Sequence, residues 1–455
     1  MAGMNPVVAM DKAVKAHQLN NYKQAEKHYL KALKQLPENQ DLHRFMGTLY
    51  GDIGKAYLSD KYFTIAKKLG PNSYVLNMSM ANTYFKLGLF ERACIAFRVS
   101  IPLSNDNRDA FFGLANSLKN TKNYSDSESI YLELINNSPD FSAAYLNLAN
   151  QYIEITKYDK SLKLLNPSLI KFPRNLDLLK SRAVASKKSG DIESAVKDFK
   201  KIIEIDPKNY DAYNYIGVMF SDHGYFLEAG QMLAKAITIN RNYAQSHYNK
   251  ALNHIRLMEI ESAKDYLNIA LKLNPDYTDA KYALGTMYLL NAEYKNGFKS
   301  LDDRMRSHYG AELPWCRKLS PNKKLLIRSM KKLGVGDLVM YSSLLDELIV
   351  KQANICVEMD GRLVKLMKRS FPKVNFLSEN TVCEKDLQSQ FDEQASMASL
   401  PKLLNLDPVM YIPKISYLAI NDDACARVRK DYQEKFSSNK LIGLAWNSTG
   451  TQGLF

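Results

Sequence analysis

Cysteine is scarce in this chain of 455 residues, and its five cysteines are widely scattered. No two of them stand in a C-x-x-C arrangement, so the sequence offers neither a zinc-ligand pair nor a disulfide framework. The five are Cys94, Cys316, Cys356, Cys383 and Cys425. We therefore expect no metal site and a reducing, cytoplasmic setting.

Long apolar runs are also missing. None approaches the ~20 residues that a membrane-spanning helix needs. Residues 1–19 carry Asp11 and Lys12 inside a helical pattern and lack the apolar core of a signal peptide. The sequence thus predicts a chain that is not transmembrane. A chain of this length exceeds one compact core, so a repeat array followed by a second domain suits it.

The formal net charge is +14, from 62 basic and 48 acidic side chains. Such a charge can indicate a nucleic-acid partner. However, residues 301–455 hold 23 basic and 18 acidic side chains, which leaves 39 and 30 for residues 1–300, so both parts are only mildly basic. No dense basic stripe with stacking aromatic residues stands out, and we predict no nucleic-acid partner. Attraction to an acidic partner or an anionic membrane surface stays open.

A regular period of about 34 residues runs through the first two-thirds of the chain. Proline fills six of eight positions in this period, with small residues ten positions after and twelve positions before each of them. The eight positions are Pro37, Pro71, Asn105, Pro139, Pro173, Pro207, Arg241 and Pro275. Ten positions after them stand Gly47, Ala81, Ala115, Ala149, Ala183, Gly217, Ala251 and Gly285. Twelve positions before them stand Ala25, Ser59, Ala93, Ser127, Ser161, Ala195, Ala229 and Ala263. This periodicity indicates a tandem repeat.

The repeat has the tetratricopeptide pattern, a pair of helices in each period. In residues 142–175, Tyr145, Ala149 and Tyr152 lie on one helical face. Ala149 is small because two helices approach closely there, and Pro173 ends the second helix. Eight full repeats are predicted from Pro6 to about residue 277, with a ninth helix pair after them. Residues 1–310 are therefore expected to form an elongated α-solenoid with a concave groove.

The first helix of each repeat should line that groove. Asn82, Asn116 and Asn150 share one position in three successive repeats, and Asn147 and Asn249 share another. An asparagine amide both donates and accepts, which suits an extended peptide backbone. We thus predict a protein or peptide partner in the groove. The alternative is that asparagine is merely tolerated on a solvated helix face.

A metal site formed by histidines is not favoured. His247 and His254 lie seven residues apart on one predicted helix, but no further ligand completes a metal set. Packing or surface roles are the better interpretation of both.

After residue 300 the period fails, and short strands alternate with helices. Strands are predicted at 324–328, 354–358 and 373–377, and helices at 338–351 and 362–370. This order predicts a parallel α/β sheet, a Rossmann-like domain at residues 311–439. A glycine loop with Gly334, Gly336 and Asp337 follows the first strand, where such sheets bind ligands. A turn closed by an N-terminal aspartate would explain the same residues.

Several short segments, in order, carry a resemblance. They are Gly297-Phe298, Pro314-Trp315, the glycine loop, Phe391-Asp392, Leu400-Pro401 and Ile442-Gly443-Leu444-Ala445-Trp446. With the repeats before them, they resemble the bacterial tetratricopeptide glycosyltransferase-like proteins, whose C-terminal region is related to heptosyltransferases and other two-Rossmann glycosyltransferases. The asparagine pattern is similar to the ladder of the O-linked N-acetylglucosamine transferases, although Val184, Val218 and Leu252 continue it with apolar residues.

The resemblance implies a mostly α protein, with a tetratricopeptide α-solenoid followed by the first half of a two-Rossmann glycosyltransferase. That half would hold the sugar acceptor. Asp337 would be the catalytic base, and Gly334 and Gly336 would shape the acceptor loop. A nucleotide-sugar is then the donor substrate, without a cofactor.

Residues 440–455 resemble the start of a second Rossmann domain, which would bind the nucleotide-sugar. From this we expect a truncated enzyme that is inactive as the 455-residue chain alone. The competing hypothesis is a non-catalytic tetratricopeptide scaffold or adaptor that mediates protein–protein interaction. A third hypothesis is that a partner chain supplies the missing domain.

Overall fold

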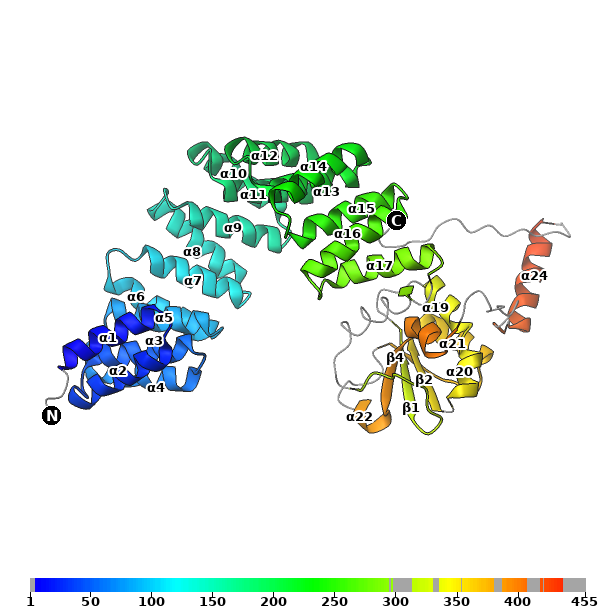
Figure 1. Cartoon of the computed structure of the whole chain (residues 1–455), viewed down its shortest axis with the longest axis horizontal. Coiled ribbons are helices and arrows are strands. Elements are labelled where there is room, and N and C mark those ends of the chain that lie inside the picture. The colour runs from blue at the N-terminus through cyan, green and yellow to red at the C-terminus, as the bar shows by residue number, and fades with distance from the viewer. Residues whose placement is uncertain are drawn as a thin grey trace. The chain divides into compact units, whose positions relative to one another are not determined.

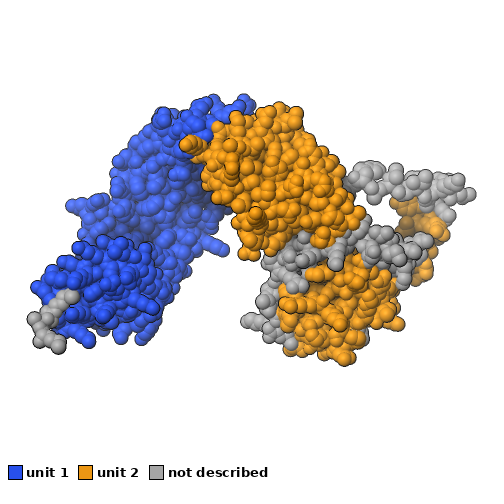
Figure 2. Space-filling model, viewed as in Figure 1, with its two compact units in different colours: residues 1–207 blue, residues 208–455 orange. Residues whose placement is uncertain are grey.

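The computed structural model describes residues 5–293, 296–297, 313–329, 335–352, 354–379, 387–406, 418–419 and 421–436 (Figure 1). The chain forms two compact units, Met1–Pro207 and Lys208–Phe455 (Figure 2). Gly334 and the segment 440–455 lie outside the described residues. The domain limits derived from the sequence therefore stay predictions.

The first unit consists of helix pairs at the predicted period (Figure 1). Its helices are α1 (Pro6–Gln18), α2 (Tyr22–Gln35), α3 (Gln40–Asp52), α4 (Ala56–Leu69), α5 (Tyr74–Lys86), α6 (Phe90–Ser100), η1 (Ile101–Leu103), α7 (Arg108–Asn120), α8 (Tyr124–Asn137), α9 (Ser142–Glu154), α10 (Tyr158–Lys171), α11 (Leu176–Ser189) and α12 (Ile192–Ile205). Helix α6 ends early, at Ser100, and a 3-10 turn with Pro102 follows it, so this proline replaces the one missing at Asn105.

The small residues lie where the two helices of a repeat approach closely, as the sequence predicts. In repeats with serine at the second-helix position, the hydroxyl donates to the carbonyl of the small residue twelve positions earlier. Ser59 bonds Gly47 at 2.8 Å, and Ser127 bonds Ala115 at 2.8 Å. A Cβ at Gly47 would lie 2.7 Å from the Phe63 ring, so the bulky residue of the second helix fills the space left by the glycine. These contacts hold the two helices of a repeat together.

Neighbouring repeats are joined by tyrosine–carboxylate hydrogen bonds. Tyr50 donates to Glu26, Tyr84 to Asp60 and Tyr152 to Glu128, and the residues of each pair are 24 positions apart. Burial, followed by the carboxylate partner, raises the pKa of Tyr84, so its hydroxyl stays a donor over the physiological range. Each bond runs from a first helix to the preceding second helix, so it fixes one repeat on the next.

The turn between the two helices of a repeat has a left-handed residue at a constant position, which the sequence did not reveal. Positive φ recurs once in every repeat, always at the equivalent residue of this turn. The residues are Asn20, Gly54, Gly88, Lys122, Thr156, Gly190, Gly224, Met258 and Ala292. Glycine adopts this conformation without steric cost, whereas other residues do not. The turn is thus dictated by the repeat and not by glycine alone.

The second unit continues the helix pairs and adds a sheet. Its repeat helices are α13 (Tyr210–Asp222), α14 (Phe226–Ile239), α15 (Ala244–Arg256), α16 (Ile260–Leu273) and α17 (Thr278–Leu290). The first helix of the predicted ninth pair is thereby confirmed as α17.

The sheet has four parallel strands in the order β3-β2-β1-β4. The strands are β1 (Lys324–Arg328), β2 (Asn354–Met359), β3 (Asn375–Ser378) and β4 (Glu393–Ser396). The helices of this region are α19 (Val335–Ser342), α20 (Leu345–Lys351), α21 (Gly361–Ser370), α22 (Leu387–Gln390), η3 (Met397–Ser399), α23 (Leu400–Leu403) and α24 (Asp422–Phe436). The predicted small parallel sheet is confirmed. The single helix predicted at 338–351 is wrong, because Ser343 and Leu344 separate α19 from α20.

Both faces of the sheet are buried. On one face Ile327 and Val357 pack with helix residues such as Leu348 in a core of nineteen buried side chains. On the other face Leu326 and Cys356 belong to a smaller buried apolar cluster. Arg328 also donates to Glu358 at 2.9 Å, and both side chains are nearly buried. A buried ion pair of this kind needs its hydrogen bond to offset desolvation. Both faces of the sheet are therefore covered by apolar side chains, and the ion pair lies toward the carboxyl ends of β1 and β2.

The left-handed turn gives a stability prediction. Replacing exposed Thr156, whose φ is 59°, with glycine removes the strain of a β-branched residue in this conformation. We expect Thr156→Gly to stabilise the first unit by about 1 kcal/mol, measured as a higher midpoint of thermal unfolding. The matched control is Lys163→Gly, an exposed position inside α10, where glycine should lower that midpoint. Equal effects of the two substitutions would contradict the interpretation.

Candidate functional site

The asparagine column consists of Asn82, Asn116 and Asn150, on helices α5, α7 and α9 of the first unit. Each asparagine directly follows a fully buried alanine of the helix pair, namely Ala81, Ala115 and Ala149. One residue further along a helix is a rotation of about 100°, so the amides lie at the edge of the buried face. The packing of the repeat thus places them, and neighbouring side chains decide what they can bind.

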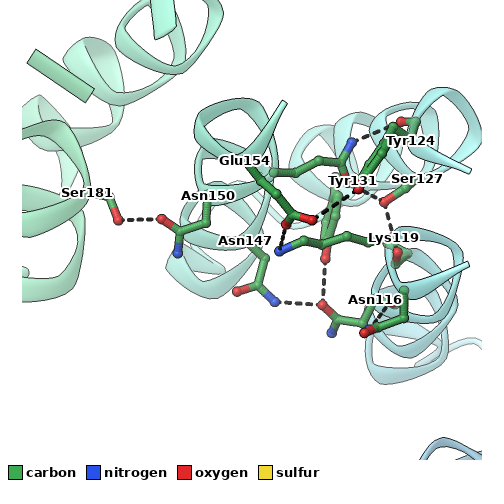
Figure 3. Close-up of polar contacts among 12 residues, drawn as sticks. Asn116, Lys119, Tyr124, Ser127, Tyr131, Asn147, Asn150, Glu154 and Ser181 are labelled. Atoms are coloured by element: carbon green, nitrogen blue, oxygen red, sulfur yellow. Dashed lines mark hydrogen bonds and ion pairs between the residues drawn. The ribbon is translucent and has the colours of Figure 1, made fainter. Parts of the chain in front are cut away.

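The amide of Asn116 is held by two donors (Figure 3). Its Oδ1 accepts from the Tyr131 hydroxyl at 2.6 Å and from Nδ2 of Asn147 at 2.8 Å. Tyr131 is fully buried, and burial raises the pKa of its hydroxyl, which therefore stays protonated and donates. Asn116 consequently satisfies a buried tyrosine and connects α7 to α9. Its Nδ2 is left without a partner among the described residues.

Asn150 repeats the same link with a different donor. Its Oδ1 accepts from the Ser181 hydroxyl at 2.8 Å, and Ser181 lies 31 positions later, the same separation as between Asn116 and Asn147 (Figure 3). The residue at this later position is therefore a donor to the column in two successive repeats. Nδ2 of Asn150 and Oδ1 of Asn147 have no partner within the described part of the chain.

Asn82 is the exception, and its neighbour explains why. The residue 31 positions after it is Gly113, which has no side chain to donate. Asn82 is exposed, and no hydrogen bond of its amide is found among the described residues. A Cβ at position 113 would lie 2.2 Å from the Phe97 ring, so packing requires this glycine. Asn82 thus presents both its oxygen and its NH₂ group.

An ion pair lies beside the column. Lys119 Nζ is 3.1 Å from a Glu154 carboxylate oxygen, and the Tyr124 hydroxyl donates to the other oxygen at 3.0 Å (Figure 3). Although slight burial acts in the opposite direction, the hydrogen bonds from Lys119 and Tyr124 hold the pKa of the Glu154 carboxyl below its ordinary value. This carboxylate is ionised at neutral pH and fixes Lys119 along the same row of first helices.

Asn249 belongs to a different network, in the second unit. Its Nδ2 donates to Oδ1 of Asn214 at 2.9 Å, and its Oδ1 accepts from Gln245 at 3.3 Å. Ser246 also donates to Asn214, and Tyr277 donates to Gln245. Only 9% of Asn249 is exposed, so both ends of its amide are occupied inside the helix pairs. Sequence inspection missed Asn214, because its position holds Lys180 and Tyr248 in adjacent repeats.

The two histidines pack on one tyrosine ring. The ring of His247 is 6.1 Å from that of Tyr266, and the ring of His254 is stacked on it at 5.3 Å. His247 also bonds the carbonyl of Arg241 at 3.0 Å, and His254 bonds Glu259. Over the described ranges, no three or more histidine, cysteine, aspartate or glutamate side chains are grouped to hold a metal ion.

The predicted acceptor loop is described only in part. Gly336 and Asp337 lie in α19, the first helix after β1. Gly336 is exposed, and a Cβ there would meet no atom within 4 Å. The roles of Asp337, Gly334 and Gly336 stay predictions. Among the described helices, none combines the length and apolar character needed to cross a membrane.

The Tyr131–Asn116 bond gives a second prediction. Asn116→Ala leaves the buried Tyr131 hydroxyl without its acceptor and should lower the free energy of unfolding by about 1–3 kcal/mol. Adding Tyr131→Phe removes the orphaned hydroxyl, so the double variant should be less destabilised than the sum of the single variants. Urea unfolding of the four proteins measures this coupling. Strict additivity would show that the two groups do not interact.

Comparison with known proteins supports the repeat assignment. The family model described as tetratricopeptide repeat matches residues 181–209 and 244–277. The human protein O-mannosyl-transferase TMTC3 is 19% identical over 291 residues, which cover 63% of this chain and 30% of TMTC3. The TPR repeat-containing protein YvcD of Bacillus subtilis is 22% identical, over 64% of this chain and 52% of YvcD. The chain thus spans about a third to a half of these two relatives.

Two similar solved structures are described as tetratricopeptide repeat proteins. A tetratricopeptide repeat protein from Parabacteroides merdae is 15% identical, covers 52% of this chain and 94% of its own, and has a TM-score of 0.45. The structure of YrrB, described as a TPR protein with an unusual peptide-binding site, is 19% identical over 42% of this chain and 98% of its own, with a TM-score of 0.34. From its family match and its helix pairs, the chain is a tetratricopeptide repeat protein with a solenoid fold.

Proposed function

We propose that the chain is a protein-interaction scaffold that binds an extended partner segment on the first-helix face of its first unit. The proposal rests on one observation about Asn82. This side chain is exposed, and within the described residues both the donor and the acceptor of its amide are unoccupied. An extended backbone alternates N–H and C=O groups, and an amide can bond both. The repeats supply the rigid support that such a site requires.

The other members of the face add one group each. Nδ2 of Asn116 and of Asn150 can donate to backbone carbonyls, and Oδ1 of Asn147 can accept from a backbone N–H. Their inward bonds hold these amides in one orientation, so less freedom is lost on binding. We leave Asn249 out, because both ends of its amide are bonded inside the second unit. A cytoplasmic location is part of this proposal.

Asn82 is also the best residue for a test. Removing Asn116 would disturb Tyr131, whereas Asn82 has no internal bond to lose. Peptides are selected from a displayed library of unstructured sequences, and their affinity is measured by fluorescence anisotropy. We expect Asn82→Ala to weaken binding about tenfold or more, because both hydrogen bonds of the amide are lost.

The matched control is Asn136→Ala, which alters an exposed asparagine on the second helix α8. Its affinity should equal that of the unaltered protein. If Asn82→Ala binds as tightly as Asn136→Ala, the face does not recognise the peptide through Asn82. Failure to select any peptide would argue against the scaffold proposal itself.

A second candidate function is glycosyl transfer, favoured by the parallel sheet with strand order β3-β2-β1-β4. In open parallel sheets, ligands bind at the carboxyl ends of the strands, and α19 follows the carboxyl end of β1. We infer that a Rossmann-like domain there holds a sugar acceptor beside Gly334 and Gly336, the latter in the first turn of α19. Asp337 is proposed as the base that deprotonates the acceptor hydroxyl. The donor is a nucleotide-sugar.

The test is nucleoside diphosphate release from a panel of nucleotide-sugars, with the selected peptides as acceptors. Asp337→Asn keeps the size of the side chain and removes the base, so it should lower release by about 100-fold or more. Substitution of Asp346, a partly exposed acid of α20, with asparagine should leave release unchanged. Release that is insensitive to Asp337→Asn would reject this base. Release that depends on Asp337 would show that the 455-residue chain is active alone, contrary to the expectation from its sequence.

A further inference from the structure

Exposed lysines recur on the second helices of the first two helix pairs. We define the lysine face by Lys23, Lys27, Lys31 and Lys34 of α2 and by Lys61 and Lys68 of α4. All six are exposed. They lie on second helices, whereas the asparagine column lies on first helices, so this surface is distinct from the proposed peptide site.

The repeat makes the two rows of lysines point the same way. Along α2 the four lysines are separated by four, four and three residues, the spacing of one helical face. Lys61 lies one repeat period after Lys27, and Lys68 lies one repeat period after Lys34. Residues one period apart occupy equivalent positions in successive repeats. The six ammonium groups therefore form one surface and are not scattered around the helices.

The carboxylates of the same helices do not neutralise this surface. Glu26 of α2 accepts from Tyr50 at 2.7 Å, and Asp60 of α4 accepts from Tyr84 and pairs with Arg92. These acids face the next repeat and serve the contact between repeats. Within the part of the chain that the structure describes, none of the six lysines has an ion pair or hydrogen bond. The positive charge is thus uncompensated.

Apolar side chains lie among the lysines. Tyr57 is 80% exposed, and its position in α4 corresponds to that of Lys23 in α2. Leu30 is 39% exposed, between Lys27 and Lys34. Lysine stems with aromatic or aliphatic side chains between them suit the boundary of a lipid bilayer, where charges meet headgroups and apolar tips reach the acyl region.

The type of cation also favours lipid. Helices α2 and α4 carry lysine and no arginine. Protein interfaces are enriched in arginine and depleted in lysine, and specific nucleic-acid contacts use the planar arginine group. Lysine is a flexible point charge, and clusters of four to eight basic residues are typical of binding to anionic membranes. We propose that the lysine face binds the surface of an anionic lipid membrane.

The test is co-sedimentation of the full chain with vesicles at low salt. Vesicles of phosphatidylcholine with phosphatidylserine should retain the protein, and vesicles of phosphatidylcholine alone should not. Raising the salt concentration should release the protein, because screening weakens the attraction. The combined variant Lys23→Gln, Lys27→Gln, Lys31→Gln and Lys34→Gln should lose at least about tenfold in vesicle affinity. These side chains are exposed, so the thermal unfolding midpoint should stay the same.

A charge-matched control separates this face from the overall charge. The variant Lys163→Gln, Lys188→Gln, Lys197→Gln and Lys200→Gln removes four exposed lysines from α10, α11 and α12. It should retain binding to the anionic vesicles within about twofold, since nearby lysines dominate the attraction. The single variant Tyr57→Ser, which keeps all six lysines, should also bind the anionic vesicles more weakly than the unaltered protein.

Three results would overturn the proposal. Equal losses in the two four-lysine variants would show that net charge and not this face attracts the vesicles. Retention by uncharged vesicles would remove the role of the lysines. Binding of a glutamate-rich peptide or a DNA duplex through this face, without retention by anionic vesicles, would assign the lysine face to that partner.

Discussion

Every repeat of this molecule depends on the close approach of two helices at one small residue on each. At this point a serine hydroxyl or a bulky side chain such as Phe63 or Leu233 occupies the space that a larger residue would fill. Ser59 reaches the carbonyl of Gly47 at 2.8 Å, and Phe63 closes over the same glycine. Because each pair buries its apolar face only against its neighbours, this contact must recur for the array to exist.

The repeat helices were predictable because that contact restricts residue type. Small residues at two fixed positions mark each pair, and proline follows the second helix in six of the eight predicted repeats. The helices begin and end close to these residues. The left-handed turn escaped prediction for the opposite reason. Glycine occupies it at Gly54 and Gly190, but Thr156 and Met258 adopt the same conformation. Because several residue types can adopt this backbone conformation, no single residue type marks the turn in the sequence.

The positions of the asparagines were predictable, but their availability was not. Whether an amide of the column is free depends on the residue 31 positions later in the next repeat. Asn147 and Ser181 can donate there, and Gly113 cannot. The hydroxyl of Tyr131 adds a second donor, at a position that holds phenylalanine or leucine in most repeats. Such pairings depend on side-chain geometry between repeats, which the periodic pattern does not contain.

In the sheet, too, some features were predictable from the sequence and others were not. Short apolar runs marked β1 and β2 in the sequence, because parallel strands that are covered on both faces are apolar at consecutive residues. The order β3-β2-β1-β4 comes from the crossovers between strands, which local residue patterns do not encode. The break between α19 and α20 at Ser343 was also hidden, because the residues on both sides keep helical periodicity.

The constant spacing of the left-handed turns has a consequence for how such an array can change in length. An insertion that is not a whole repeat would displace three features from one another. These are the left-handed turn, the contact between small residues, and the hydrogen bond between an asparagine of the column and the residue 31 positions later. Duplication of a complete repeat keeps all three in register and adds one further first helix to the face. The array can thus be extended in steps of one repeat, and the length of partner segment that its face can accommodate grows in the same steps.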